Sequence, residues 1–136
     1  MMNVLHEAII GIGSNVPIGA DKKIESMCDR LAALGTIERM SGIYVTSPFG
    51  NKKPNACKYN NEVIVLSTAF DLEELNDIIK TIETELGRRR DSGSDEVTID
   101  ADIVIWDNKI IREVDVKRDY FSIGYKIVKS DVKNIP

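Results

Sequence analysis

The sequence has few of the residues on which several common classes of protein depend. Its two cysteines, Cys28 and Cys57, lie far apart without the spacing of a metal site, and His6 is the only histidine. These scarcities argue against a disulfide framework or a zinc site, and they predict a reduced, cytoplasmic protein. Because Cys28 lies at an apolar position of a predicted helix, we expect it to pack in the core.

Long apolar runs and an excess of positive charge are also missing. No apolar run approaches the ~20 residues that span a bilayer, and the start, MMNVLHEAIIGIG, lacks a signal peptide's charged beginning and cleavage site. The 18 lysines and arginines are outnumbered by 22 aspartates and glutamates, for a formal net charge of −4. A general nucleic-acid binder is normally basic. We therefore expect neither a membrane nor a nucleic acid as partner.

What the chain does contain is typical of one soluble globular domain. Its 136 residues are 43% hydrophobic and 29% charged. A chain of this length buries roughly two thirds of its unfolded surface. The sequence contains no repeat, low-complexity tract or interdomain linker, so we interpret residues 1–136 as a single domain and expect a monomer.

Hydrophobic periodicity predicts two amphipathic helices, at residues 20–34 and from Asp71 onward, the second starting with a capping box between Asp71 and Glu74. Shorter apolar or alternating stretches predict strands at residues 7–13, 37–46, 59–67 and 100–106. The last strand turns at Asp107-Asn108 into a hairpin, and a short apolar element covers residues 125–128. This order is that of the ferredoxin-like split βαβ fold. The fold class is α+β, with a mostly antiparallel sheet and both helices packed on one face.

The strongest chemical signal lies in residues 83–102. Asp100 and Asp102 interrupt an apolar strand, and because alternate strand positions share a face, the two carboxylates project side by side. A hard divalent cation such as Mg²⁺ relieves their repulsion, since it binds carboxylates together with water and phosphate oxygens. Upstream, the run Arg88-Arg89-Arg90 supplies guanidinium groups, which grip phosphate. The combination predicts magnesium-assisted phosphoryl chemistry.

Each motif also has a purely structural explanation. An Asp-x-Asp at a strand end can be a solvated edge, and arginines at a helix C-terminus can complement the helix dipole. The Gly13-Ser14-Asn15 segment after the first strand is a turn, which can also bring backbone close to a ligand. Asn61, at a strand entry, is either a turn residue or an amide that recognises a heterocycle presenting both donors and acceptors.

Five fragments, taken in chain order, resemble those of one family, 6-hydroxymethyl-7,8-dihydropterin pyrophosphokinase. They are Gly13-Ser14-Asn15; YVTSPFG at residues 44–50; Tyr59-Asn60-Asn61; Glu83 followed by GRRR at residues 87–90; and Asp100-Ala101-Asp102-Ile103. Together, over about residues 9–106, they form a specific signal.

The resemblance implies an enzyme of folate biosynthesis that transfers pyrophosphate from ATP to 6-hydroxymethyl-7,8-dihydropterin and releases AMP. Such transfer depends mainly on positioning and charge neutralisation. Asp100 and Asp102 would hold two Mg²⁺ ions that bridge the ATP phosphates, and Arg88 would stabilise charge on the transferred group.

The same resemblance implies the binding residues. Asn61 would hydrogen-bond the pterin ring and Tyr59 would stack on it, with the backbone around Thr46 and Phe49 completing the pocket. Lys80 takes the place of the family's more usual glutamine. The residues implied to bind the nucleotide are Lys80, Glu83, Arg88, Arg90 and Arg118.

The chain departs from the family pattern in the loop at residues 91–98, DSGSDEVT, which lacks the family's Trp-Gly-Pro-Arg and adds acid. The family's later Pro-His segment is also missing, and Arg118, Tyr120 and Phe121 are the loose counterparts of its arginine and stacking aromatic. An alternative is therefore a pterin-binding or regulatory relative that has lost efficient transfer. A third hypothesis is a ferredoxin-like interaction module without a small-molecule site.

Overall fold

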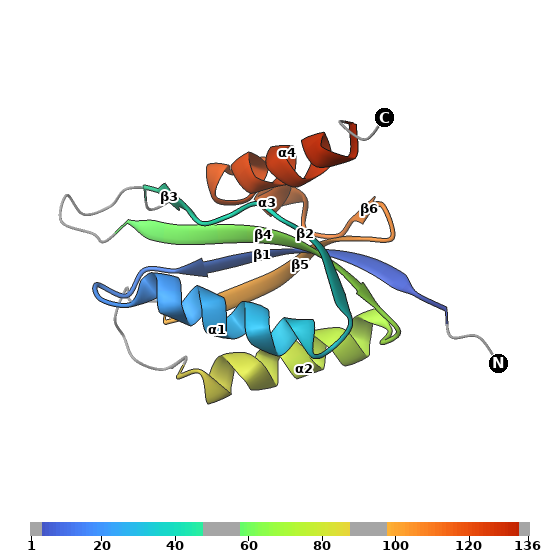
Figure 1. Cartoon of the computed structure of the whole chain (residues 1–136), viewed down its shortest axis with the longest axis horizontal. Helices are drawn as coiled ribbons and strands as arrows, with labels where there is room; N and C mark the ends of the chain where they lie inside the picture. The colour runs from blue at the N-terminus through green and yellow to red at the C-terminus, as the bar shows by residue number, and fades with distance from the viewer. Residues whose placement is uncertain (1–3, 48–57, 88–97, 134–136) are drawn as a thin grey trace.

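A computed structural model describes residues 4–47, 58–87 and 98–133, with side chains described as far as residue 130. One sheet lies between helices on its two faces (Figure 1). The strands are β1 (His6–Ser14), β2 (Thr36–Met40), β3 (Tyr44–Thr46), β4 (Tyr59–Thr68), β5 (Asp100–Trp106) and β6 (Lys109–Ile110). The helices are α1 (Ala20–Ala32), α2 (Leu72–Glu85), α3 (Glu113–Val116) and α4 (Asp119–Lys133).

The sheet brings three segments that are distant in sequence to one end of the molecule. Its strand order is β2-β4-β1-β5-β6, and β3 pairs with β4 beside β2. All of these pairings are antiparallel. In the register of the central strands, Gly13 of β1 lies opposite both Asn61 of β4 and Asp100 of β5. The sheet therefore places the amide and the acid pair on either side of one glycine.

Two hydrophobic cores hold the layers together. On one face, α1 and α2 cover β1, β4 and β5, with Ile10, Ile24 and Ile79 among the fully buried residues. On the other face, Phe121 and Val128 of α4 pack against Val63 and Val104 of the sheet. The α+β fold with a mostly antiparallel sheet, and with both expected helices on one face, is confirmed. No helix within the described ranges is long and apolar enough to cross a membrane.

Several local predictions are confirmed. In the capping box at the start of α2, the Glu74 amide donates to Asp71 Oδ1 at 2.8 Å and the Asp71 amide donates to Glu74 Oε1 at 3.1 Å. Asp107 and Asn108 have φ angles of 48° and 67°, as a tight hairpin turn between β5 and β6 requires. Cys28 is buried in the core beneath α1.

Two local predictions are wrong in extent. The single strand expected at residues 37–46 is two strands, because the chain turns at Gly42, where φ is 84°. The short apolar element expected at residues 125–128 is part of α4, a helix of 15 residues. This helix covers the second face of the sheet, which the sequence did not lead us to expect.

Candidate functional site

Asp100 and Asp102 lie on the same face of β5, as the alternation of the strand predicts. Between and beyond them, Ala101 and Ile103 are buried against the core beneath α1 and α2. Strand β6 pairs with Ile105 and Trp106, which lie farther along β5. The acid pair therefore stands where β5 has only β1 as a described neighbour.

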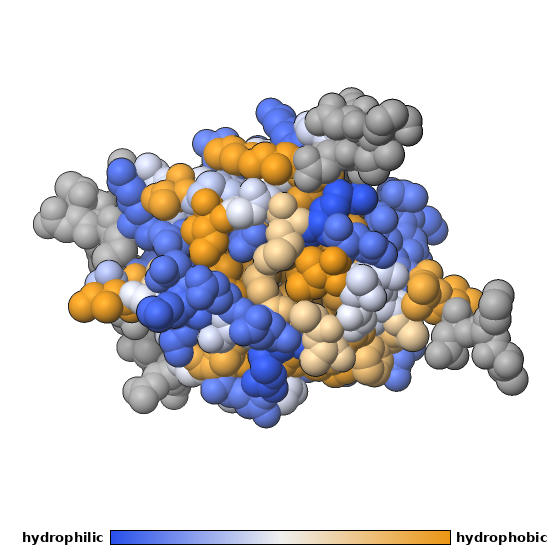
Figure 2. Space-filling view, viewed as in Figure 1, coloured by the Kyte–Doolittle hydropathy of each residue, from blue (hydrophilic) through white to orange (hydrophobic). Residues whose placement is uncertain are grey.

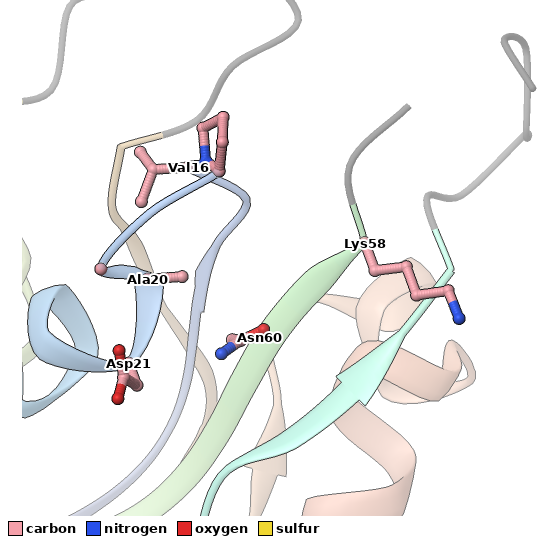
Figure 3. A pocket seen from close by; sticks show the side chains of 7 residues that line it. Val16, Ala20, Asp21, Lys58 and Asn60 are labelled. Carbon is pink, nitrogen blue, oxygen red and sulfur yellow. The ribbon is translucent and has the colours of Figure 1, made fainter. Parts of the chain in front are cut away.

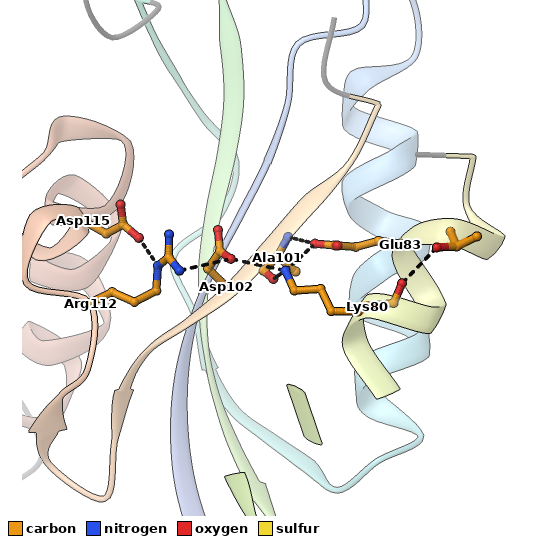
Figure 4. A network of polar contacts seen from close by, with 7 residues as sticks. Lys80, Glu83, Ala101, Asp102, Arg112 and Asp115 are labelled. Carbon is orange, nitrogen blue, oxygen red and sulfur yellow. Dashed lines mark hydrogen bonds and ion pairs between the residues drawn. The ribbon is translucent and has the colours of Figure 1, made fainter. Parts of the chain in front are cut away.

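Two cationic side chains approach the same oxygen of Asp102 from different elements (Figure 4). Lys80 Nζ, from α2, lies 3.4 Å from Asp102 Oδ1, and Arg112 Nη1, from the segment after β6, lies 3.8 Å from it. Burial is the main cause that raises the pKa of Asp102 from 3.8 to about 6, followed by the charge of Asp100 and a hydrogen bond with it. Lys80 and Arg112 act in the opposite direction. Lys80 and Arg112 thus offset only part of the unfavourable effect that burial and Asp100 have on the charged form of Asp102.

Glu83 is completely buried one helical turn after Lys80 and ties α2 to β5. Its Oε2 accepts a hydrogen bond of 2.7 Å from the backbone amide of Ala101. The Lys80 ammonium lies 3.3 Å from the same Glu83 oxygen and 3.3 Å from the carbonyl oxygen of Ala101. Both residues therefore converge on the strand segment that carries the acid pair. Contact of Lys80 or Glu83 with a nucleotide stays a prediction.

Arg112 is a site residue that the sequence did not suggest. Its Nε donates to Asp115, and the Tyr120 hydroxyl donates to the same carboxylate. The hydrogen bond to Asp115 is the main cause that raises the pKa of Arg112, so the guanidinium remains charged. In the sequence, the only sign of a role for Arg112 is that Asp115 follows it by three residues. Its closeness to Asp102 depends on the hairpin and α3.

The predicted pterin residues that the structure describes lie together at the ends of β3 and β4. Asn61 is 2% exposed, and its Nδ2 donates to Thr46 Oγ1 at 2.9 Å. The same nitrogen lies 3.3 Å from the carbonyl oxygen of Tyr59. A Cβ on Gly13 would lie 3.4 Å from Asn61 Oδ1, so a glycine here keeps the space beside the amide open. Pterin contact by Asn61, Tyr59 and Thr46 stays a prediction.

The Gly13-Ser14-Asn15 segment has a structural role. Ser14 is completely buried, and its hydroxyl donates to the carbonyl oxygen of Thr98 at 2.6 Å. This bond fixes the point at which the chain enters β5. The segment thereby positions the acid pair from the neighbouring strand.

Other predicted residues lie elsewhere. Phe49, Arg88, Arg90 and most of the acidic loop at residues 91–98 lie outside the described residues. Arg118 precedes α4, and its carbonyl oxygen accepts a 2.7 Å hydrogen bond from the Ser122 amide. Phe121 is 1% exposed in the core, so its ring is not available at the surface to stack on a ligand.

An open pocket of about 440 Å³ lies at the same end of the sheet, between the loop after β1, the start of α1 and the start of β4 (Figure 3). Asp21, Lys58 and Asn60 are the polar or charged residues among its lining. Among the predicted site residues that the structure describes, none lines this pocket. Its lining residues are Val16, Pro17, Gly19, Ala20, Asp21, Lys58 and Asn60.

The acid pair suits a metal that takes only part of its coordination shell from protein. Within the described ranges, no three His, Cys, Asp or Glu side chains are grouped to hold a metal ion. Two carboxylate oxygens beside each other fit Mg²⁺, which fills its remaining positions with water and phosphate oxygens. A metal here would therefore depend on its substrate for ligands.

Comparison with known proteins shows what the chain as a whole is similar to. Residues 9–128 match the family model described as 7,8-dihydro-6-hydroxymethylpterin-pyrophosphokinase (HPPK). No curated protein matches the chain. Among solved structures, wild-type HPPK-DHPS of Plasmodium falciparum with pteroate is similar, with a TM-score of 0.56 and 15% sequence identity. The match covers 99% of this chain and 35% of that one, so this chain spans about a third of the length of that protein. At this identity, the likeness concerns the fold.

Proposed function

Because this chain belongs to the 7,8-dihydro-6-hydroxymethylpterin-pyrophosphokinase family, we propose that it transfers the pyrophosphoryl group of ATP to 6-hydroxymethyl-7,8-dihydropterin, releasing AMP, in folate biosynthesis. The observation that carries the proposal is the side-by-side pair Asp100 and Asp102, with Lys80 and Arg112 within 4 Å of Asp102. Paired carboxylates and flanking cations at one strand end suit the transfer of a pyrophosphoryl group from ATP to a hydroxyl group, because this chemistry depends on charge neutralisation and alignment.

The proposal gives the chain's own groups the following roles, that of Arg88 resting on the family resemblance alone. Asp100 and Asp102 would hold Mg²⁺, which supplies charge neutralisation on the phosphate oxygens. Asn61 and Thr46, joined by a hydrogen bond, would form the wall against which the pterin ring lies. In the sheet register, Gly13 lies between Asn61 and Asp100. A pterin bound at this wall would direct its hydroxymethyl group towards phosphates held at the acid pair. Arg88 would stabilise the negative charge that develops during transfer.

The test is AMP release from ATP, measured with and without 6-hydroxymethyl-7,8-dihydropterin at saturating Mg²⁺. We expect pterin-dependent AMP from the wild type, and a loss of at least about a hundredfold in Asp100→Asn and Asp102→Asn. Asp107→Asn is the matched control, because Asp107 follows the same strand but pairs with His6. Full turnover in either variant of the acid pair, with the control also active, would exclude the metal-holding role.

A second function is favoured by one feature of the sequence. The loop at residues 91–98 carries three acidic residues and no arginine, which opposes the binding of ATP phosphates. A relative that binds pterin but no longer transfers pyrophosphate would be protected by pterin against thermal unfolding and would release no AMP. We further propose a cytoplasmic monomer, which size-exclusion chromatography with light scattering would test.

A further inference from the structure

Three oxygen atoms surround the ammonium group of Lys80 at nearly equal distances. Glu83 Oε2 and the Ala101 carbonyl oxygen each lie 3.3 Å from Nζ, and Asp102 Oδ1 lies 3.4 Å from it. Figure 4 shows the lysine extending from α2 to the edge of β5, where these atoms converge. Two carboxylates and a backbone carbonyl form the set of hard oxygen donors that binds metal cations in proteins. In this protein, a lysine nitrogen occupies their centre.

A helical ion pair alone does not explain this arrangement. Lys80 and Glu83 are three residues apart on α2, and such pairs are common on helices. Two of the three oxygens, however, belong to β5 and come from a different layer of the fold. Glu83 is completely buried, and it also holds the Ala101 amide. The ammonium therefore lies, in a side chain that is 33% exposed, at a point where α2 and β5 meet.

The second cation near Asp102 is held differently. Arg112 lies farther away, at 3.8 Å, and its side chain is 49% exposed. Its Nε is bonded to Asp115, so the guanidinium has a partner of its own away from the acid pair. Arg112 is therefore shared between Asp102 and the buried carboxylate of Asp115. Lys80 contacts both the buried Glu83 and Asp102, so its departure would remove a cationic partner from both carboxylates.

We propose that Lys80 is a resident cation of the acid pair, which occupies the Asp102 oxygen that faces α2 and competes with divalent metal ions for this carboxylate. The inference rests on the proposed metal-holding role of Asp100 and Asp102. A positive charge this close repels a divalent ion, so the pair binds metal weakly until phosphate groups bring compensating negative charge. Lys80 thereby makes metal binding depend on the nucleotide.

The experiment measures Mn²⁺ binding to the protein without nucleotide, by electron paramagnetic resonance of free Mn²⁺. The wild type is compared with Lys80→Met, which removes the charge and keeps much of the side chain's length. We expect Lys80→Met to bind Mn²⁺ at least about tenfold more tightly than the wild type. We also expect Mn²⁺ to raise the melting temperature of this variant more than that of the wild type, because a ligand of the native state stabilises it.

The matched control is Lys23→Met. Lys23 also donates to a backbone carbonyl, that of Leu86 at 2.6 Å, but it is not among the charges that act on Asp102. Its Mn²⁺ affinity should stay within about twofold of the wild type. Lys80→Gln, which keeps an N–H donor for Ala101 or Asp102, serves the same test if Lys80→Met does not fold.

The outcomes separate the inference from the proposed function. If Lys80→Met and the wild type bind Mn²⁺ with equal affinity, the competition is refuted while the metal site stands. If both bind and the variant binds more weakly, Lys80 supports the metal instead, which also overturns the inference. If neither protein binds Mn²⁺ without nucleotide, the inference is refuted, whereas the metal-holding role of the acid pair fails only if Mn²⁺ also does not bind in the presence of ATP.

Discussion

Replacing Asp102 by asparagine should make the folded protein more stable at neutral pH. Asparagine has nearly the shape of a protonated aspartic acid and carries no charge. Burial and the charge of Asp100 raise the pKa of Asp102 to about 6, so the folded protein binds this proton more tightly than the unfolded chain does. Protonation of Asp102 therefore favours the folded state. This contribution to the free energy of unfolding is fully present below the unfolded pKa and is lost as the pH rises through about 6.

The size of the effect follows from the same pKa. A rise from 3.8 to about 6 corresponds to about 3 kcal/mol in the free energy of unfolding. Solvent screening reduces this value, because the Asp102 side chain is 22% exposed. We therefore expect Asp102→Asn to gain about 1 to 3 kcal/mol at neutral pH. At about pH 4 the gain should nearly vanish, because the wild-type carboxyl is then largely protonated.

The assay is urea unfolding followed by far-UV circular dichroism, in the presence of EDTA, at both pH values. Asp107→Asn is the control of opposite sign, because a hydrogen bond from the Glu7 amide and the contact with His6 lower the pKa of Asp107. This variant should be less stable than the wild type at neutral pH, and the deficit should fade as the pH falls through the folded pKa. A destabilised Asp102→Asn at neutral pH, or a gain that does not change with pH, would refute the reasoning.

Three other substitutions or modifications test the packing. Gly35→Ala should lower the free energy of unfolding by about 1 to 3 kcal/mol, although Gly35 is exposed. The reason is that a Cβ would lie 2.0 Å from the Ser67 carbonyl oxygen. An unchanged urea midpoint would contradict this. Asp71→Ala should lower the free energy of unfolding by about 1 kcal/mol, because it removes the acceptor of the Glu74 amide. Asp71→Asn should retain most of the stability. Equal losses of stability in the two variants would count against the cap. Burial raises the pKa of the Cys28 thiol to about 12, so native Cys57→Ser protein should react with a thiol reagent only under unfolding conditions; rapid labelling at neutral pH would show that Cys28 is accessible.

Features that depend on near neighbours in the chain were predictable. Asp71 and Glu74 cap α2 across a single turn, and Asp107-Asn108 favours the positive φ angles of a tight hairpin. Asp100 and Asp102 share a face because the side-chain period of a strand is two. In each case the interacting groups are a few residues apart, so their spacing determines their geometry.

The helix α4 shows where such local reasoning ends. Its sequence contains Gly124 and several aromatic and β-branched residues, which form helices weakly by themselves. Packing supplies the stability, because Phe121 and Val128 are buried against the sheet. Gly124 permits the close approach, since a Cβ there would lie 2.5 Å from Val63 Cγ2.

The acid pair was evident in the sequence, but its electrostatic surroundings were not. Lys80 lies 22 residues from Asp102 and on a different layer. Arg112 is brought back to Asp102 by the hairpin between β5 and β6, and Asp115 of α3 binds its Nε. The charge state of a carboxylate depends on burial and on which cations lie within about 4 Å of it. For segments so far apart in the chain, residue spacing carries no information about those distances, and the packing of α2 and α3 around β5 sets them.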